Sequence, residues 1–158
     1  MLEFRIGTRD MERQLAHRGA EAELSVDESG RLEAELKRLP VKGLGRIAAG
    51  ARFGPLSVDR RTGEVRLPLQ VRHVLGVRLG RAFVTRKLLE ALAKRLKLRE
   101  AEIDAERGVL SADVASLLSK LAPPLAGYRV TAADFVRGGR SAEDGLRVVL
   151  EAPGAQDA

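Results

Sequence analysis

The chain contains no cysteine and no tryptophan, and aromatic side chains make up only 3% of its 158 residues. The absence of cysteine excludes disulfides and thiolate chemistry. No apolar run reaches the roughly 18 residues of a membrane-spanning helix, so the sequence predicts none. The scarcity of aromatic residues leaves few platforms on which single-stranded nucleobases could stack.

Motifs that carry catalysis or metal binding are also missing. The only histidines are His17 and His73, and no HExxH, CxxC, GxSxG or Walker-type sequence occurs. The glycine-rich stretch VKGLGRIAAG, residues 41–50, lacks the spacing of a dinucleotide-binding fingerprint and is interpreted as a flexible connector. We therefore expect no catalytic residue, no metal site and no cofactor, and a protein that is not an enzyme.

The composition is that of a globular protein, with 44% apolar and 32% charged residues. The length suits one domain, predicted over residues 1–152, followed by a frayed tail at 153–158. The opening sequence MLEFRIGTRDMERQ lacks the apolar core of a signal peptide. The sequence as written therefore predicts a cytoplasmic protein, with peripheral membrane association as its route to a lipid surface.

The net charge of +6 is concentrated in one block. Residues 60–99 carry twelve basic and two acidic side chains, a net charge of +10. Such a block favours an anionic partner, either nucleic acid, lipid headgroups or another protein. An arginine-rich, solvated surface that reflects coding bias is the alternative. The predicted basic surface consists of Arg66, Arg72, Arg78, Arg86, Lys87, Lys94, Arg95 and Lys97.

Capping residues and apolar spacing predict three helices. Thr8 is the expected N-cap of a helix over residues 9–18, and Thr85 that of a helix over 86–96. Ser111 is the expected N-cap of a third helix, which Pro123 and Pro124 end. The 86–96 helix has leucines on one side and basic residues on the other. This pattern is typical of a helix on an anionic membrane surface, or of a core helix with a basic solvent face.

Alternating apolar and polar residues predict four β-hairpins. Their paired segments are 20–26 with 32–37, 56–58 with the start of 64–80, 101–103 with 109–110, and 128–132 with 146–150.

An internal repeat relates the two halves of the chain. GTRDMERQLAHR, residues 7–18, aligns with VTRKLLEALAKR, residues 84–95. Shortly afterwards AELSVDESGRL matches AEIDAERGVL. We expect two similar helix–hairpin halves, residues 1–79 and 80–152, that share one core. Chance similarity between two amphipathic helices is the alternative.

The longest alternating segment is EVRLPLQVRHVLGVRLG, residues 64–80. As one straight strand it would span about 53 Å, whereas a compact domain of this length is about 39 Å across. We therefore expect the strand to bend across a curved sheet, with a break near His73 or an elongated domain as alternatives. Its predicted ligand-lining face consists of Val65, Leu67, Leu69, Val71, His73, Leu75, Val77 and Leu79.

His73 interrupts this otherwise apolar face. A locally hydrogen-bonded histidine at a bend or rim of the strand is the simpler interpretation, and contact with a polar group of a ligand is the alternative. The fold class expected from all these patterns is α+β. In it, a strongly curved antiparallel sheet packs on two or three amphipathic helices.

The C-terminal half, with PPLAGYRVTAADFVRGG followed by DGLRVVLEA, resembles the tubular lipid-binding superfamily. This superfamily includes bactericidal-permeability-increasing-like proteins and the mycobacterial mannan-elongation lipid-binding relatives. Pro124, Gly127, Arg129–Thr131 and Asp144–Leu146 stand where those relatives have Pro, Gly, an R-V-T strand and a D-G-L hairpin. The resemblance implies a curved sheet around helices and an apolar groove for acyl chains.

Taken together, the sequence predicts a non-enzymatic binding protein for an apolar or lipid-like ligand, with a basic face toward anionic headgroups. One alternative is a nucleic-acid-associated protein that binds phosphates through residues 60–99. Another is a structural or assembly module, in which a strand edge or an exposed leucine face pairs with another copy in a homo-oligomer.

Overall fold

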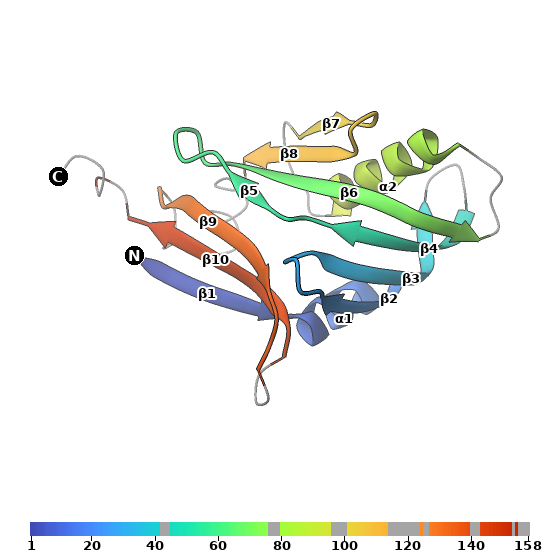
Figure 1. Ribbon diagram of the computed structural model, residues 1–158, viewed down its shortest axis with the longest axis horizontal. Coiled ribbons are helices and arrows are strands. Elements are labelled where there is room, and N and C mark those ends of the chain that lie inside the picture. Colours follow the sequence, from blue (N-terminus) through green and yellow to red (C-terminus); the bar gives the residue numbers. More distant parts are fainter. Residues whose placement is uncertain are drawn as a thin grey trace.

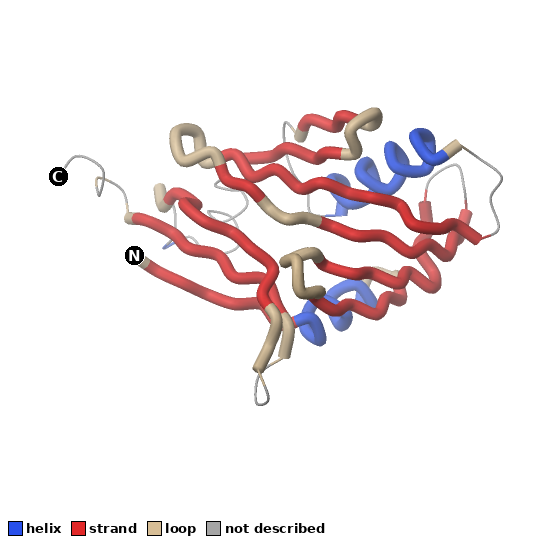
Figure 2. Tube along the Cα trace, in the orientation of Figure 1, coloured by secondary structure: helices blue, strands red, loops and turns tan. Residues whose placement is uncertain are grey.

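Figures 1 and 2 show the protein as a computed structural model, which describes residues 1–41, 45–75, 80–95, 101–113, 124, 127–139, 143–152 and 154. This part of the chain contains two helices and ten strands. In chain order they are β1 (Leu2–Gly7), α1 (Thr8–His17), β2 (Glu21–Val26), β3 (Leu32–Val41), β4 (Gly45–Phe53), β5 (Ser57–Val58), β6 (Glu64–Leu75), α2 (Arg81–Arg95), β7 (Glu102–Asp104), β8 (Val109–Asp113), β9 (Arg129–Val136) and β10 (Gly145–Glu151).

The strands form two antiparallel sheets, and the α+β class is confirmed. The seven-stranded sheet has the order β2-β3-β4-β6-β8-β7, with β5 also paired to β6. It is open, because β2 and β7 remain at its edges. The three-stranded sheet has the order β1-β10-β9, so it joins the first strand of the chain to the last two (Figure 1).

Both helices pack on one face of the seven-stranded sheet (Figure 2). In α2, Val84, Leu88 and Leu89 are at most 5% exposed and belong to the same core as Leu69 and Val71 of β6. Leu15 of α1 packs against this core further along the sheet. Complete burial of a leucine such as Leu89 contributes about 2–3 kcal/mol to folding, and this packing fixes α2 on the sheet.

The opposite face of the seven-stranded sheet is charged. Its side chains alternate with the core residues along each strand, as expected for an antiparallel sheet with one solvated face. This charged face carries Glu23, Glu33, Glu35, Lys37, Arg52, Gln70, Arg72 and His73.

All four predicted hairpins are confirmed, as β2–β3, β5–β6, β7–β8 and β9–β10. The connector interpretation of residues 41–50 is wrong at Val41, which ends β3, and from Gly45 onward, where the central strand β4 begins. Residues 42–44 lie outside the described part of the chain. The same holds for residue 153 and for 155–158, in the predicted tail.

The helix starts differ from the predicted caps. The N-cap of α1 is Gly7, and Thr8 is the first helical residue, buried at 6% exposure. Helix α2 begins at Arg81, so Thr85 lies inside it and is also buried. Ser111 is part of β8, which continues to Asp113. A third helix would fall largely on residues 114–123, outside the described part of the chain.

Strand β6 contains 12 residues, and its alternation reverses near its end. Ala51 of β4 lies opposite Val71, but the residue before it, Gly50, lies opposite His73 and not opposite Arg72. Arg72 is therefore an extra residue in β6, a β-bulge that moves every later side chain to the other face. Predicting one unbroken apolar face was wrong at this point.

Asp144 connects the two sheets. It lies just before β10, and its carboxylate accepts hydrogen bonds from the backbone N–H groups of Val26 and Gly138, each at 2.8 Å. These bonds hold the pKa of Asp144 below its usual value, helped by the positive charge of Arg137. Beside them, Phe135 of β9 is buried with Val26 in a small apolar cluster. The three-stranded sheet is thus attached at a defined place on the larger sheet.

Candidate functional site

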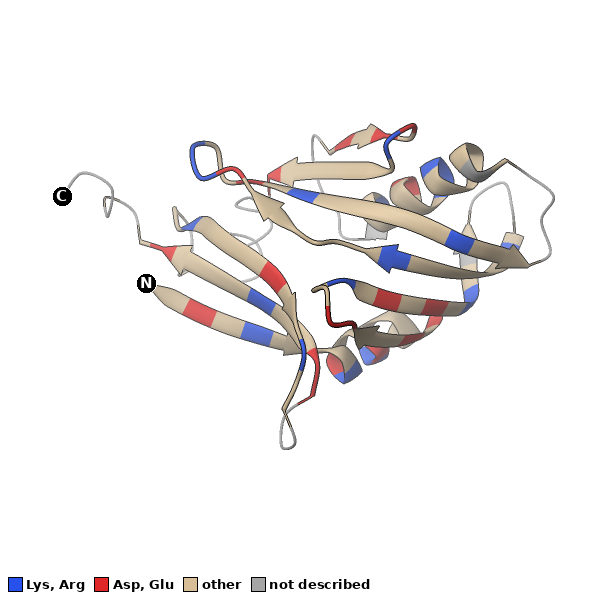
Figure 3. Cartoon of the chain, in the orientation of Figure 1, with Lys and Arg blue, Asp and Glu red and all other residues tan. Residues whose placement is uncertain are grey.

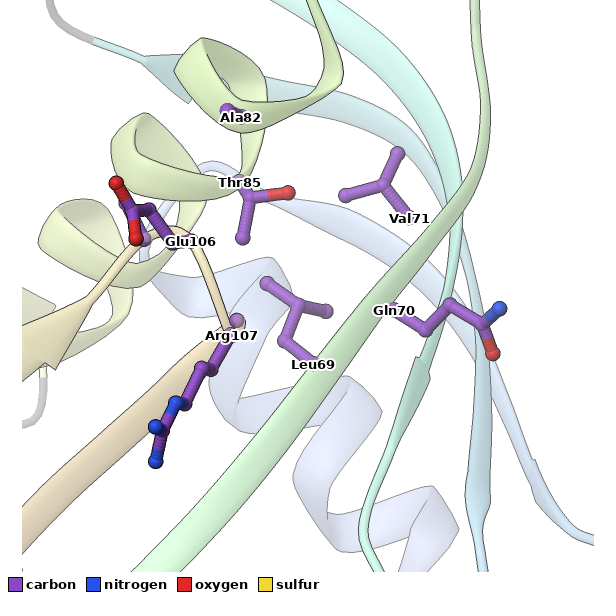
Figure 4. Close-up of a pocket in the computed structure, with 9 residues that line it drawn as sticks. Leu69, Gln70, Val71, Ala82, Thr85, Glu106 and Arg107 are labelled. Carbon is purple, nitrogen blue, oxygen red and sulfur yellow. The ribbon is translucent and has the colours of Figure 1, made fainter.

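A pocket lies between α2, β6 and the turn that joins β7 to β8, with a volume of about 210 Å³ (Figure 4). Strand β6 contributes Leu69, Gln70 and Val71. Helix α2 contributes Ala82 and Thr85. The turn contributes Ala105, Glu106, Arg107 and Gly108. The volume is below the 300–1,000 Å³ typical of pockets that enclose a drug-sized ligand.

The turn is held against β6 through backbone contact. The Leu69 N–H donates to the carbonyl oxygen of Gly108 at 2.6 Å. A Cβ at Gly108 would collide with the carbonyl oxygen of Leu69, and the φ of Gly108 is +67°, in the region that favours glycine. Within the turn, the Arg107 N–H donates to the carboxylate of Asp104 at 3.2 Å. Glycine is therefore required for the turn to form this wall of the pocket.

The side chains around the pocket divide into an apolar interior and a polar rim. Leu69, Val71 and Thr85 point toward one another in Figure 4, while Gln70 points away on the other side of β6. Leu69 and Val71 are each 5% exposed, and Thr85 is 8% exposed. Glu106 and Arg107 lie at the rim and are exposed. The arrangement offers an apolar ligand a small recess with one hydroxyl group.

The solvent side of α2 combines an aromatic ring with basic residues. Phe83 is 44% exposed, and the Lys87 ammonium lies 5.6 Å from the centre of its ring. Arg86 and Lys94 are exposed on the same helix. Glu90 is the one acidic residue of α2, and its carboxylate lies 3.7 Å from Lys87. We call Phe83, Arg86, Lys87 and Lys94 the α2 outer face.

On the charged face, acidic and basic groups are already paired. The carboxylate of Glu33 contacts Arg52 at 2.5 Å and Arg72 at 2.8 Å. Nε2 of His73 lies 3.4 Å from Glu35, and its ring covers Gly50, where a Cβ would collide with it. These pairs cross from β3 to β4 and β6. They stabilise strand pairing on an exposed surface, where each such pair is worth about 0.2–1 kcal/mol.

The predicted ligand-lining residues are divided among several places. Leu69 and Val71 line the pocket. Leu67 is half-buried beside the core, and Val65 packs toward the three-stranded sheet. The remaining predictions do not join them. His73 and Leu75 lie on the charged side of the sheet, with Leu75 64% exposed, and Val77 and Leu79 lie outside the described residues.

The predicted basic surface is also divided. Arg66 and Arg72 extend from the charged face, near Glu64 and Glu33 respectively, whereas α2 covers the opposite face of the sheet. Arg86, Lys87 and Lys94 therefore stay together without them. Arg95 is the last residue of α2, and the structure describes its backbone only. Arg78 and Lys97 lie outside the described residues.

Several residues around the pocket were not predicted from the sequence. Thr85 was interpreted as a helix cap, and the turn sequence AERG as a simple hairpin connection. The sequence predicts this helix only from residue 86, so that Ala82 precedes it. The one available signal was Gly108, because a glycine at the end of a hairpin turn often marks a close backbone approach.

The described residues contain no group of three or more metal-ligating side chains placed to hold a metal ion. Neither α1 nor α2 is long and apolar enough to cross a membrane. Comparison of the chain with models of protein families, with curated proteins and with solved structures finds no match. The function is therefore argued from the pocket and the α2 outer face.

Proposed function

We propose that the protein is a non-enzymatic binding protein for an apolar or lipid-like ligand, which it meets at an anionic membrane surface. The ligand places a short apolar segment, such as the end of an acyl chain, between Leu69, Val71 and Thr85. The α2 outer face lies against the headgroups. The proposal rests on one observation, that a single helix carries the pocket on one side and an exposed phenylalanine among basic residues on the other.

The chemistry of the α2 outer face supports a lipid surface. Transfer of an exposed aromatic ring to the boundary between headgroups and acyl chains is favourable. Each basic side chain near an anionic surface adds about 1 kcal/mol of attraction. Phosphate binding to nucleic acid through residues 60–99 is less favoured, because Arg72 is already paired with Glu33 and Arg66 lies 3.6 Å from Glu64.

The proposal includes the strongly curved sheet and the two related halves expected from the sequence. Register shifts after Leu36 in β3 and at Arg72 in β6 support curvature, because bulges bend strands and increase their twist. The order helix, hairpin occurs twice, as α1 with β2–β3 and as α2 with β7–β8, which supports a duplication. Of these two features, only the curved sheet is implied by the resemblance to tubular lipid-binding proteins.

Vesicle flotation tests the membrane part of the proposal. The protein is mixed with vesicles of phosphatidylcholine alone or with phosphatidylglycerol, at low and high salt. We expect flotation with the anionic vesicles only, and less of it as salt rises, because screening weakens surface attraction. Equal flotation with both vesicle types, or none with either, would contradict the proposal.

A matched pair of variants locates the contact. Phe83 and Leu2 are both 44% exposed, but Leu2 lies at the start of β1, far from α2 in Figure 1. Phe83→Ala is expected to reduce flotation about fivefold or more, because it removes the one aromatic anchor of the α2 outer face. Leu2→Ala is expected to float like the wild type. An equal loss in both variants would point to nonspecific adsorption.

A further inference from the structure

Two of the four outer strands of the sheets, β2 and β1, differ in how their free edges are protected. An exposed strand edge presents unpaired N–H and C=O groups that can pair with another chain. On β2 two of the N–H groups are engaged by side chains. The Leu24 N–H donates to Glu12 at 2.9 Å, and the Val26 N–H donates to Asp144 at 2.8 Å.

Strand β1 carries no such protection among the described residues. It is six residues long, it pairs with β10, and no side chain of the described residues hydrogen-bonds to its backbone. It contains no proline. Figure 1 shows β1 along the lower margin of the ribbon. As far as the described residues go, this edge is open for a further strand, whereas β2 has two N–H groups engaged and β7 is only three residues long.

The charges on β1 alternate with apolar residues. Glu3 and Arg5 are exposed and stand two residues apart, as Figure 3 shows in red and blue. Phe4 lies between them and packs against a second apolar cluster, formed by Val130, Val148 and Leu150. Within the monomer, Arg5 lies opposite Arg147, whose charge is already bound by Asp134 at 2.9 Å and 3.1 Å. Among the described residues, no carboxylate lies within ion-pair distance of the Arg5 guanidinium.

We propose that β1 pairs antiparallel with β1 of a second copy, in a register centred on Phe4. In that register, Glu3 lies opposite Arg5 of the second copy, and Arg5 opposite its Glu3. Leu2 lies opposite Ile6, so the apolar residues of both copies share the other face. The two three-stranded sheets become one six-stranded sheet with a two-fold axis through Phe4.

The sequence of β1 selects this register over its neighbours. Antiparallel hydrogen bonding allows only registers centred on a residue, since paired residues must direct their backbone groups the same way. Centring on Glu3 would place two glutamates opposite each other. Centring on Arg5 would do the same with two arginines. Like charges directly opposite destabilise strand pairing, so only the Phe4 register joins opposite charges.

The dimer is expected to be reversible and dependent on concentration. One pair of six-residue strands is a small contact, and interfaces below about 1,200 Å² are typical of weak complexes. Sedimentation velocity over a wide concentration range measures it directly. Wild-type protein that stays monomeric throughout this range would overturn the proposal.

Charge reversal tests the register. Glu3→Arg and Arg5→Glu each place two like-charged pairs across the axis. The dissociation constant of the dimer is therefore expected to rise at least about tenfold in each variant alone. An equimolar mixture of the two variants restores both opposite-charge pairs, and native mass spectrometry is expected to show the mixed dimer. The double variant, with both reversals in one chain, should dimerise like the wild type.

Glu3 and Arg5 are exposed, so none of these variants is expected to change the unfolding temperature. Undiminished dimerisation of the single variants, or a mixture without the mixed dimer, would overturn the proposal even where the wild type is dimeric. We also expect the monomeric single variants to float with vesicles as the wild type does, because β1 lies apart from α2.

Discussion

Leu69 and Gly108 meet backbone to backbone, with the Leu69 N–H donating to the Gly108 carbonyl oxygen at 2.6 Å. This contact joins the β7–β8 turn to β6 and forms one wall of the pocket. It depends on the absence of a side chain at Gly108, where the φ is +67°. The pocket is therefore built on backbone geometry as much as on apolar side chains.

Gly108→Ala is expected to lower the free energy of unfolding by about 2–3 kcal/mol, because the new methyl group meets the Leu69 carbonyl and the φ is strained. Urea denaturation followed by circular dichroism measures the change. Gly139→Ala is the control, since a Cβ there has nothing within 4 Å. A similar small effect of both substitutions would show that the turn is not held as described.

Leu89→Ala is expected to lower the free energy of unfolding by about 3–4 kcal/mol, because the side chain is 0% exposed in the core beneath α2. Leu75→Ala makes the same chemical change at a position that is 64% exposed, after the β6 bulge, and should change it by at most about 0.5 kcal/mol. A large loss at Leu75 would mean that the strand keeps one phase throughout.

Asp144→Asn is expected to lower the free energy of unfolding by about 1–2 kcal/mol at pH 7, because the charged carboxylate accepts two backbone hydrogen bonds, one from Val26 of the larger sheet and one from Gly138 beside β9. The folded pKa of Asp144 is lowered from 3.8, so this stabilisation is present above the unfolded pKa and lost as pH falls through the folded pKa. The difference in unfolding free energy between wild type and variant should therefore be constant at neutral pH and shrink below about pH 4.

Urea titrations at a series of pH values measure that gap. Glu28→Gln serves as the control, since the Glu28 side chain is 92% exposed and its single ion pair with Arg137 is long, at 3.5 Å. We expect it to have little effect at any pH. A gap for Asp144→Asn that does not change on acidification would rule out the charge as the source of the stabilisation.

The hairpins were predictable because alternation and turn residues are local signals. Strand β4 was missed because GRIAAGARF is rich in glycine and alanine, residues that are depleted in strands. Their smallness has a reason in the tertiary structure, since Gly50 leaves room for the His73 ring. That reason depends on a strand more than twenty positions away in the chain, so no local pattern contains it.

The candidate site was predictable only in part. Leu69 and Val71 were identified because their alternation holds as far as the bulge at Arg72. Beyond it, the face of His73 and Leu75 depends on how β6 pairs with β4, which sequence alternation does not show. Thr85 and Gly108 join the site through the packing of α2 and the turn on β6, and both contacts are long-range.

Native mass spectrometry with oleic acid tests the central claim most directly. Ala82 is exposed at the edge of the pocket on α2, and Ala16 is an exposed alanine on α1. Wild-type protein and Ala16→Trp are expected to retain one bound oleic acid, and Ala82→Trp to lose it because the indole occupies the recess. Equal retention by all three proteins, or no retention by the wild type, would contradict ligand binding in this pocket.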